Sequence, residues 1–284
     1  MSAPSFTNLI RFLDENSVEW YGQVAPESLN NIEGAVVKVL GHDIENIRDT
    51  GTTAVVKKAS VTGALVARAS FYLHRAELRC TCQGGQSNKM ELPENPVIFM
   101  KPADALAGPY DTITVPKEAH LLDYEGELCI IIGKDGKDIQ PKDAIDHIFG
   151  YTVGNDLSSR HWQRPPRAGG QFCYAKSFDG FAPIGPTILS PHVATAESLH
   201  LTTKVNGEVR QQSPISDMIF NVQDIICHCS RGTTLRKGTV IMTGTPSGIA
   251  AKMPGSPWLR NGDVVEVTIS HIGTLRNRLA FKGT

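Results

Sequence analysis

The segment YEGELCIIIGK, residues 124–134, restricts the possible folds more than any other part of this sequence. It alternates at first and then becomes continuously apolar, which is typical of a strand that enters a hydrophobic core. Glu125 and Glu127 stand two residues apart, so both carboxylates leave the same face of the strand, about 7 Å apart along it. Two carboxylates that enter a core cost free energy unless a cation joins them or a proton neutralises one. The pair therefore predicts a hard divalent cation with oxygen ligands, unless the segment is a solvated edge strand with a charged rim.

A third carboxylate, Asp156, ends a second strand candidate, GYTVGND, and precedes LSSRHWQ. If a helix begins there, Asp156, Arg160 and Gln163 lie at i, i+4 and i+7 on one helical face. Such a face could complete a metal site and bind an anionic or carbonyl substrate. A helix N-cap with an internal pair between Asp156 and Arg160 explains the same spacing, so both interpretations stay open.

Three weaker signals point to the same kind of chemistry. Lys176 lies in YAKSFDGFAPIG, which is otherwise mostly aromatic, small or apolar, so an inward-facing lysine would need an anionic partner; a solvated lysine is the alternative. The turn TGTPSG, residues 243–248, follows an apolar strand, and its backbone N–H groups and Thr245 could bind a carboxylate. His74 and Glu77 stand three apart on a predicted short helix, where the glutamate could orient the imidazole as a general base; an ordinary solvated helix explains the pair equally.

The rest of the chain predicts a fold of many strands and few helices. Of the 284 residues, 40% are hydrophobic and 20% charged, which is the composition of an ordinary globular protein. We expect a hairpin over residues 8–24, a second hairpin at Asn206-Gly207, and a helix of about 14 residues within 216–230. The pattern favours an α+β, mainly β fold rather than a doubly wound parallel sheet. It further predicts a small β-rich N-terminal domain, residues 1–68, before the main domain, residues 69–284.

Charge and targeting signals limit the partners. The 28 basic and 29 acidic residues give a net charge of −1, which provides no field to gather nucleic acid or an anionic membrane. The N-terminal segment has no apolar run long enough for a signal peptide, and no stretch approaches a membrane span, so we expect a cytoplasmic protein. None of the six cysteines has C-x-x-C spacing, which favours buried, reduced thiols.

Taken in order, several segments resemble the fumarylacetoacetate hydrolase superfamily over about residues 70–284. These segments are FMKP (99–102), LLDYEGELCIIIGK (121–134), GYTVGNDLSSRHWQ (150–163), AKSFDGFAPIGP (175–186), VNGEVRQ (205–211) and VIMTGTPSGI (240–249), with GDVVEVTI and GTLRNR closing the chain. The resemblance implies a mixed, rolled β-sheet fold, usually in a homodimer. It also implies Mg²⁺ or Mn²⁺ held by Glu125, Glu127 and Asp156.

The same resemblance assigns roles to further residues. It implies that the substrate is contacted by Phe99, Lys101, Arg160, Gln163, Lys176 and Thr245, the last of which receives a substrate carboxylate. FYLHRAE is similar to the family's N-Y-x-x-H-x-x-E segment, which implies that His74 and Glu77 form a mobile dyad that activates water. Phe71 stands where asparagine is usual, and His161 where aspartate is common.

The chemistry that this resemblance implies is hydrolytic cleavage of a C–C bond in a 1,3-diketo or acylpyruvate-type acid. The metal would stabilise a developing enolate, a water activated by His74 would attack the distal carbonyl, and Lys176 would neutralise the departing enolate. Decarboxylation of an oxaloacetate-type acid and tautomerisation of a 2-hydroxy-dienedioate pass through the same enolate, so both remain alternatives. A catalytically silent protein that only binds an oxo acid is the alternative from a different class.

Overall fold

β-Strands outnumber helices among the described residues and form several sheets, which confirms the predicted α+β, mainly β fold class. The computed structural model describes residues 6–60, 70–73 and 94–283. The largest sheet has 12 strands: β1 (Asn8–Leu13), β2 (Glu19–Gln23), β3 (Val36–Gly41), β4 (Thr53–Val55), β5 (Lys58–Ser60), β6 (Ser70–Leu73), β7 (Ile98–Lys101), β8 (Leu106–Ala107), β11 (Gly126–Ile132), β13 (Ile148–Asn155), β15 (Ala182–Leu189) and β19 (Val240–Met242). Its main path runs β4-β3-β2-β1-β15-β13-β11-β19-β6-β7.

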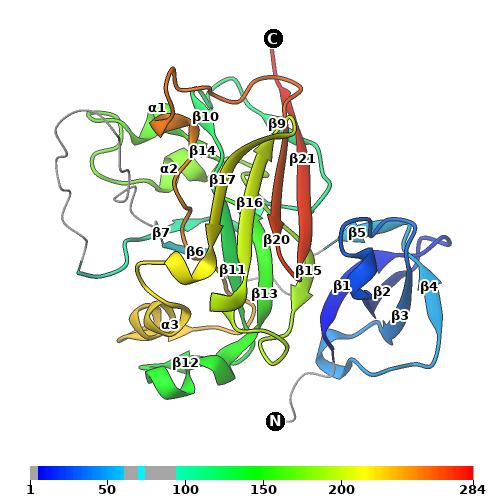
Figure 1. Cartoon of the computed structure of the whole chain (residues 1–284). Coiled ribbons are helices and arrows are strands. Elements are labelled where there is room, and N and C mark those ends of the chain that lie inside the picture. Colours follow the sequence, from blue (N-terminus) through cyan, green and yellow to red (C-terminus); the bar gives the residue numbers. More distant parts are fainter. Residues whose placement is uncertain (1–5, 61–69, 74–93, 284) are drawn as a thin grey trace.

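A second sheet of five strands lies against the first (Figure 1). Its order is β17 (Glu208–Pro214), β16 (His200–Val205), β20 (Val264–Ile269), β21 (Gly273–Phe281) and β9 (Ile113–Val115). Two short pairs complete the described strands: β10 (Leu122–Asp123) with β14 (Ser158–Ser159), and β12 (Gly136–Lys137) with β18 (Thr234–Leu235). The α-helices are short: α1 (Arg160–Gln163), α2 (Cys173–Lys176) and α3 (Val222–Ser230). The 3-10 helices are η1 (Pro26–Ser28), η2 (Ile44–Asn46), η4 (Ala103–Ala105), η5 (Pro141–His147), η6 (Ala196–Ser198), η7 (Ile215–Asp217) and η8 (Ala250–Lys252).

Strand β11 is buried along its whole length, as its apolar run predicts. The two faces of the strand enter different core clusters. Leu128, Ile130 and Ile132 pack into the larger cluster, which the five-stranded sheet shares. Cys129 and Ile131, on the same face as the carboxylates, pack into a second cluster.

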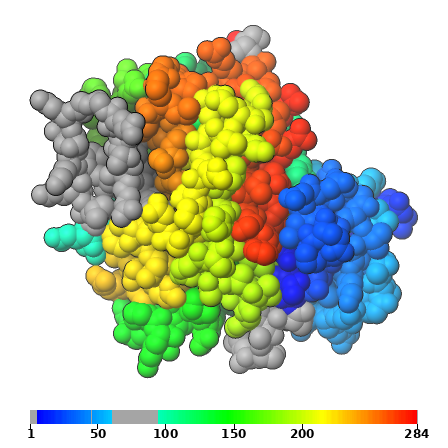
Figure 2. Space-filling model, in the orientation of Figure 1, coloured from blue at the N-terminus to red at the C-terminus, as the bar shows by residue number. Residues whose placement is uncertain are grey.

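The N-terminal strands are tied into the large sheet. β1 and β2 form the predicted hairpin, and β1 also pairs with β15 through the register Asn8↔Leu189. Figure 2 shows this N-terminal part, in blue, packed beside the C-terminal strand in red. The boundary predicted near residue 68 lies outside the described residues, so the two-domain division stays a prediction.

The structure corrects several predicted elements. The helix expected within 216–230 begins only at Val222, because Asn221 caps it: its side chain accepts from the Asp224 N–H at 2.8 Å and Asp224 bonds back. Asp156 is not on a helix, since strand β14 intervenes before α1, and Lys176 is the last residue of helix α2. Residues 71–73, expected in a helix, belong to β6. The predicted turn at Asn206-Gly207 is confirmed, with both residues at positive φ.

None of the helices in the described part of the chain is long and apolar enough to cross a bilayer. Cys129 and Cys229 are buried, as predicted, and burial raises the pKa of both thiols. Cys173 and Cys227 are half-buried, and Cys80 and Cys82 lie outside the described residues.

Candidate active site

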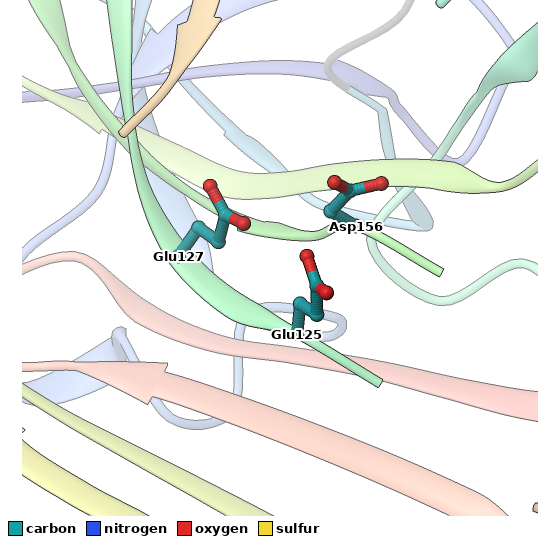
Figure 3. A group of neighbouring side chains, drawn as sticks. All are labelled: Glu125, Glu127 and Asp156. Carbon is teal, nitrogen blue, oxygen red and sulfur yellow. The ribbon is translucent and has the colours of Figure 1, made fainter. Parts of the chain in front are cut away.

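Three carboxylates from two adjacent strands meet inside the protein (Figure 3). Glu125, Glu127 and Asp156 are each at most 1% exposed, and one oxygen of each lies within 4.8 Å of the others. Backbone pairing produces this convergence, because Gly126 opposes Asn155 at the start of β11 and the end of β13. The Asp156 N–H donates to the Glu125 carbonyl at 2.8 Å, which fixes the third carboxylate beside the first. The predicted trio is thus brought together.

Lys176 lies between two of these acids and is completely buried. Its Nζ is 2.8 Å from Glu125 Oε2, and it also donates to Asp156 Oδ2 and, at 2.8 Å, to Ser158 Oγ. Burial opposes its charge, but Asp156 and Glu125 outweigh that effect and hold the pKa of Lys176 above its ordinary value. The inward-facing lysine with anionic partners is confirmed.

Lys101 supports the same group of acids from the other side of Asp156. Its Nζ lies 2.7 Å from Asp156 Oδ1 and donates to the Phe181 carbonyl at 2.6 Å. Burial, with help from the neighbouring charge of Lys176, lowers the pKa of Lys101 to about 8. In this structure Lys101 therefore orients a carboxylate, while its predicted contact with substrate stays a prediction.

Arg160 is held by two acids at once. Its Nη2 donates to Glu125 Oε1 at 2.6 Å, its Nε donates to Asp123 Oδ2 at 2.9 Å, and its Nη1 donates to Gln163 Oε1 at 2.8 Å. Burial disfavours the guanidinium charge, but Glu125 and Asp123 raise the pKa of Arg160 above its ordinary value. Arg160 and Gln163 therefore share one face of α1, as predicted, although Asp156 is not on this helix.

Asp123 is a site residue that the sequence reasoning missed. It is fully buried, and it accepts the N–H groups of Tyr124, Ala250 and Ala251 at 2.8 to 3.0 Å in addition to the Arg160 guanidinium. The signal was present, because Asp123 stands two residues before Glu125 in the same segment, LLDYEGE.

Glu127 is the one member of the trio without a cationic partner in the described part of the chain. Its Oε2 accepts the Gly244 N–H at 2.6 Å. Burial, followed by repulsion from Asp156 and Glu125, raises the pKa of Glu127 well above its ordinary value. A bound cation would remove the free-energy cost of burying this carboxylate in its charged form.

The charges of the cluster show what kind of ion fits. Seven buried ionisable side chains contact one another or share the trio's space: the acids Asp123, Glu125, Glu127 and Asp156, and the bases Lys101, Arg160 and Lys176. With all of them charged, one negative charge is in excess. A divalent cation would turn this excess into one positive charge, which suits an anionic substrate, and the all-oxygen donor set suits Mg²⁺ or Mn²⁺.

The turn of residues 243–248 borders this cluster. Gly244 contacts Glu127 as described, and the Thr245 hydroxyl donates to the Gly126 carbonyl at 2.9 Å. Gln211, on β17, donates from Nε2 to the Thr245 oxygen at 2.7 Å. Gln211 was also missed by the sequence reasoning, although it ends the VNGEVRQ segment at an inward position of an alternating strand.

Comparison with known proteins identifies the family. The fumarylacetoacetate (FAA) hydrolase C-terminal family matches residues 66–280. The chain belongs to this family. It is 40% identical over 194 residues to oxaloacetate tautomerase YisK of Bacillus subtilis (strain 168), which is 68% of this chain and 64% of that protein. It is 39% identical over 201 residues to the fumarylacetoacetate hydrolase domain-containing protein 2 homolog of Dictyostelium discoideum, covering 67% of this chain and 66% of the relative. The chain thus spans slightly less than two thirds of the length of these curated relatives.

Among solved structures, the chain is similar to 2-hydroxyhepta-2,4-diene-1,7-dioate isomerase from Mycobacterium marinum. The TM-score is 0.80 at 30% identity, and the match covers 98% of this chain and all of the other. The carboxylate trio thus lies within the part of the chain that the fumarylacetoacetate hydrolase family covers.

Other residues that the fumarylacetoacetate hydrolase resemblance singled out have mixed outcomes. The Phe99 ring is buried, with Lys176 Nζ 5.0 Å from its centre, so it lines the cluster. His161 packs its ring edge-on against His120 at 5.3 Å and contacts none of the three carboxylates. His74 and Glu77 lie outside the described residues, so their dyad stays a prediction.

A separate hollow of about 490 Å³ lies between the loop of residues 30–33 and the β20–β21 hairpin, where Glu33, Tyr110 and Arg276 line it. It shares no residue with the carboxylate cluster and therefore contributes nothing to the chemistry of that cluster.

Proposed function

We propose that this protein is a divalent-metal-dependent enzyme that interconverts the keto and enol forms of a short oxo diacid such as oxaloacetate. The observation that carries the proposal is the buried trio of Glu125, Glu127 and Asp156, whose excess negative charge calls for a cation. The names of the relatives supply the reaction type, because both the tautomerase and the isomerase relocate a proton on an oxo or hydroxy diacid. This replaces C–C hydrolysis as the leading hypothesis, although a fumarylacetoacetate hydrolase from Exiguobacterium antarcticum is also among the similar solved structures.

A bound cation would supply Lewis acidity that polarises the 2-oxo group of the substrate. The protein's own residues would do the rest. Lys176, fixed between two carboxylates, would place a positive charge beside the oxygen on which negative charge develops. Arg160 and Gln163 would bind one end of the diacid, and the turn that contains Thr245 would bind the carboxylate at the other end.

We further propose that the resident ion is Mg²⁺ or Mn²⁺, that the protein is a homodimer and that it works in the cytoplasm. The oxygen-only donors support the choice of ion. Native mass spectrometry of the purified protein tests the assembly, and metal analysis of protein expressed without added metal tests the ion.

An assay of the purified protein with Mg²⁺ tests the reaction type. The enol form absorbs in the ultraviolet, so decay of enol-oxaloacetate reports tautomerisation directly, and product analysis detects decarboxylation or cleavage of acylpyruvates. We expect metal-dependent acceleration of the enol decay. Cleavage of an acylpyruvate without tautomerisation would restore the hydrolase hypothesis, and tight binding of every oxo acid without turnover would favour the silent binding protein.

The best variant for this assay is at Glu127. Replacing Glu125 with Ala would abolish activity but would also remove a carboxylate partner from both Arg160 and Lys176, so loss of folding would confuse the result. Glu127→Gln removes a ligand charge without removing a cation's partner, and we expect metal affinity to fall by at least about 100-fold. Glu208→Gln, at an exposed carboxylate of β17, is the matched control and should keep wild-type affinity.

His74→Ala separates hydrolysis from tautomerisation. If His74 activates water, the variant loses any cleavage of acylpyruvates more than it loses enol decay. Equal loss of both activities would contradict a water-activating role.

A further inference from the structure

Gln211 is a buried amide whose hydrogen-bonding groups connect two separate parts of the site. It is 1% exposed on β17. Its Oε1 accepts the Gly126 N–H at 3.0 Å, and its Nε2 donates to Thr245 Oγ1 at 2.7 Å and to the Pro246 carbonyl at 2.9 Å. One side chain thus joins the start of β11 to the turn of residues 243–248.

Chemistry alone fixes the orientation of this amide. The Gly126 N–H can only donate and the Pro246 carbonyl can only accept, so the amide oxygen and nitrogen cannot be exchanged. Nε2 therefore donates to the Thr245 hydroxyl, whose single hydrogen goes to the Gly126 carbonyl at 2.9 Å. The hydroxyl has no hydrogen left for a substrate carboxylate.

The turn can still offer main-chain donors. Among the residues that the structure describes, the main-chain N–H of Thr245 has no acceptor, although the residue is only 4% exposed. The preceding N–H, of Gly244, already points at Glu127. A bound carboxylate is the kind of group that would satisfy the Thr245 N–H beside the trio.

Gly126, the residue between the two glutamates, is held by hydrogen bonds at both its N–H and its carbonyl. Gly126 gives its N–H to Gln211 and its carbonyl accepts from Thr245. A Cβ atom at this position would lie 2.2 Å from Thr203 Oγ1, so β11 approaches the five-stranded sheet too closely for any side chain. Movement of the turn is therefore transmitted to the backbone that carries Glu125 and Glu127.

We infer that Gln211 is a positioning residue, which aims the Thr245 main-chain N–H at the substrate carboxylate and fixes the backbone between Glu125 and Glu127. The inference rests on the proposed function for its substrate. Gln211 is not one of the proposed metal ligands, yet it would set the distance between the ion and the turn that binds the carboxylate.

Gln211→Met tests this role, because it keeps the length of the side chain and removes all three hydrogen bonds. We expect KM for oxaloacetate to rise at least about tenfold while kcat stays within about threefold, as for loss of a contact made equally before and during reaction. Hydrogen exchange of the metal-free protein should quicken in peptides that contain Gly126 and residues 243–249. Gln212→Met, on the exposed side of the same strand, is the matched control and should change neither quantity.

A double-mutant cycle shows whether Gln211 acts through Thr245. Thr245→Val removes the hydroxyl, and the KM of the double variant should then be no higher than that of the worse single variant. If Gln211→Met does not fold, Gln211→Glu takes its place, because it keeps the acceptor for Gly126 and loses both donors. In Gln211→Glu, hydrogen exchange at the Gly126 N–H should stay slow, while hydrogen exchange in residues 243–249 should become faster.

The inference is overturned if a folded Gln211 variant keeps wild-type exchange in the turn, keeps wild-type KM, or shows additive effects with Thr245→Val. Wild-type protein that is inactive on every oxo acid would instead refute the proposed function. In that event the exchange experiment alone decides whether Gln211 fixes the turn.

Discussion

Glu127 differs from the other acids of the cluster because the fold provides it with a neutral donor and no cation. Asp123 and Glu125 contact Arg160, and Asp156 contacts both lysines. Glu127 has only the Gly244 N–H in the described structure. At the scale of single residues, this asymmetry identifies Glu127 as the buried charge that a bound cation would stabilise.

Glu127→Gln should therefore stabilise the metal-free protein. The pKa of Glu127 in the folded state is raised above its ordinary value of 4.5, so its protonated form favours folding and its charged form opposes folding. The wild type loses this contribution as the pH rises from about 4.5 through the raised pKa, and the variant does not. We expect a gain of about 1–3 kcal/mol at neutral pH that shrinks as the pH is lowered, measured by denaturant unfolding with a chelator present. A less stable variant at neutral pH would contradict this explanation.

The residues that the sequence revealed are those whose chemistry is unusual for their setting. Two glutamates in an apolar strand and a lysine in an apolar run are conspicuous without a structure, and all three are buried in the cluster. Asp123 and Gln211 were missed because an aspartate at a strand end and a glutamine within a strand are both ordinary. Their importance depends on partners that are 37 and 85 residues away in the chain.

At the scale of elements, strand β11 fixes the directions of both glutamates because it is paired within the large sheet and packs closely against the five-stranded sheet. Its alternation was readable from the sequence, and both faces enter the predicted apolar surroundings. A helix in 157–163 was proposed from the sequence, and α1 occupies only its last four residues; α2 was not predicted, since a four-residue helix depends on packing against the cluster. The start of α3 was misjudged because the apolar stripe continues past the Asn221 cap.

The close approach of β11 to the five-stranded sheet can be tested with a pair of variants. Gly126→Ala puts a Cβ 2.2 Å from Thr203 Oγ1, so we expect a loss of about 1–3 kcal/mol in the free energy of unfolding. Thr203→Ala in the same chain removes the clashing oxygen, which has no hydrogen-bond partner in the described structure, and should restore part of the loss. Denaturant unfolding of both variants measures the effect. If the second substitution worsens the first, the two sheets do not meet as described.

At the scale of the whole molecule, the N-terminal strands belong to the core beneath the site. Phe6, Leu9 and Tyr21 share a cluster with Cys129 and Met242, on the face of β11 that carries the carboxylates. Asn8 also donates to the His271 carbonyl at 2.6 Å, which joins the two ends of the described chain. A small N-terminal domain was predicted from its strands, but sheet continuity between β1 and β15 could not be read from local patterns.

Removal of residues 1–68 should therefore expose the β15 edge and part of this apolar cluster. We expect the shortened chain to associate or aggregate, because an uncovered apolar edge pairs with other chains. Light scattering at rising protein concentration measures this, with Asn8→Ala as the milder control that should stay dispersed. A dispersed and active shortened chain would show that the N-terminal strands are dispensable.

Anomalous X-ray scattering from crystals soaked in Mn²⁺ tests the metal assignment most directly. We predict one strong peak at the manganese edge, with oxygens of Glu125, Glu127 and Asp156 about 2.0–2.3 Å away. A peak at other residues, or no peak while Lys176 still bridges Glu125 and Asp156, would contradict the proposed site.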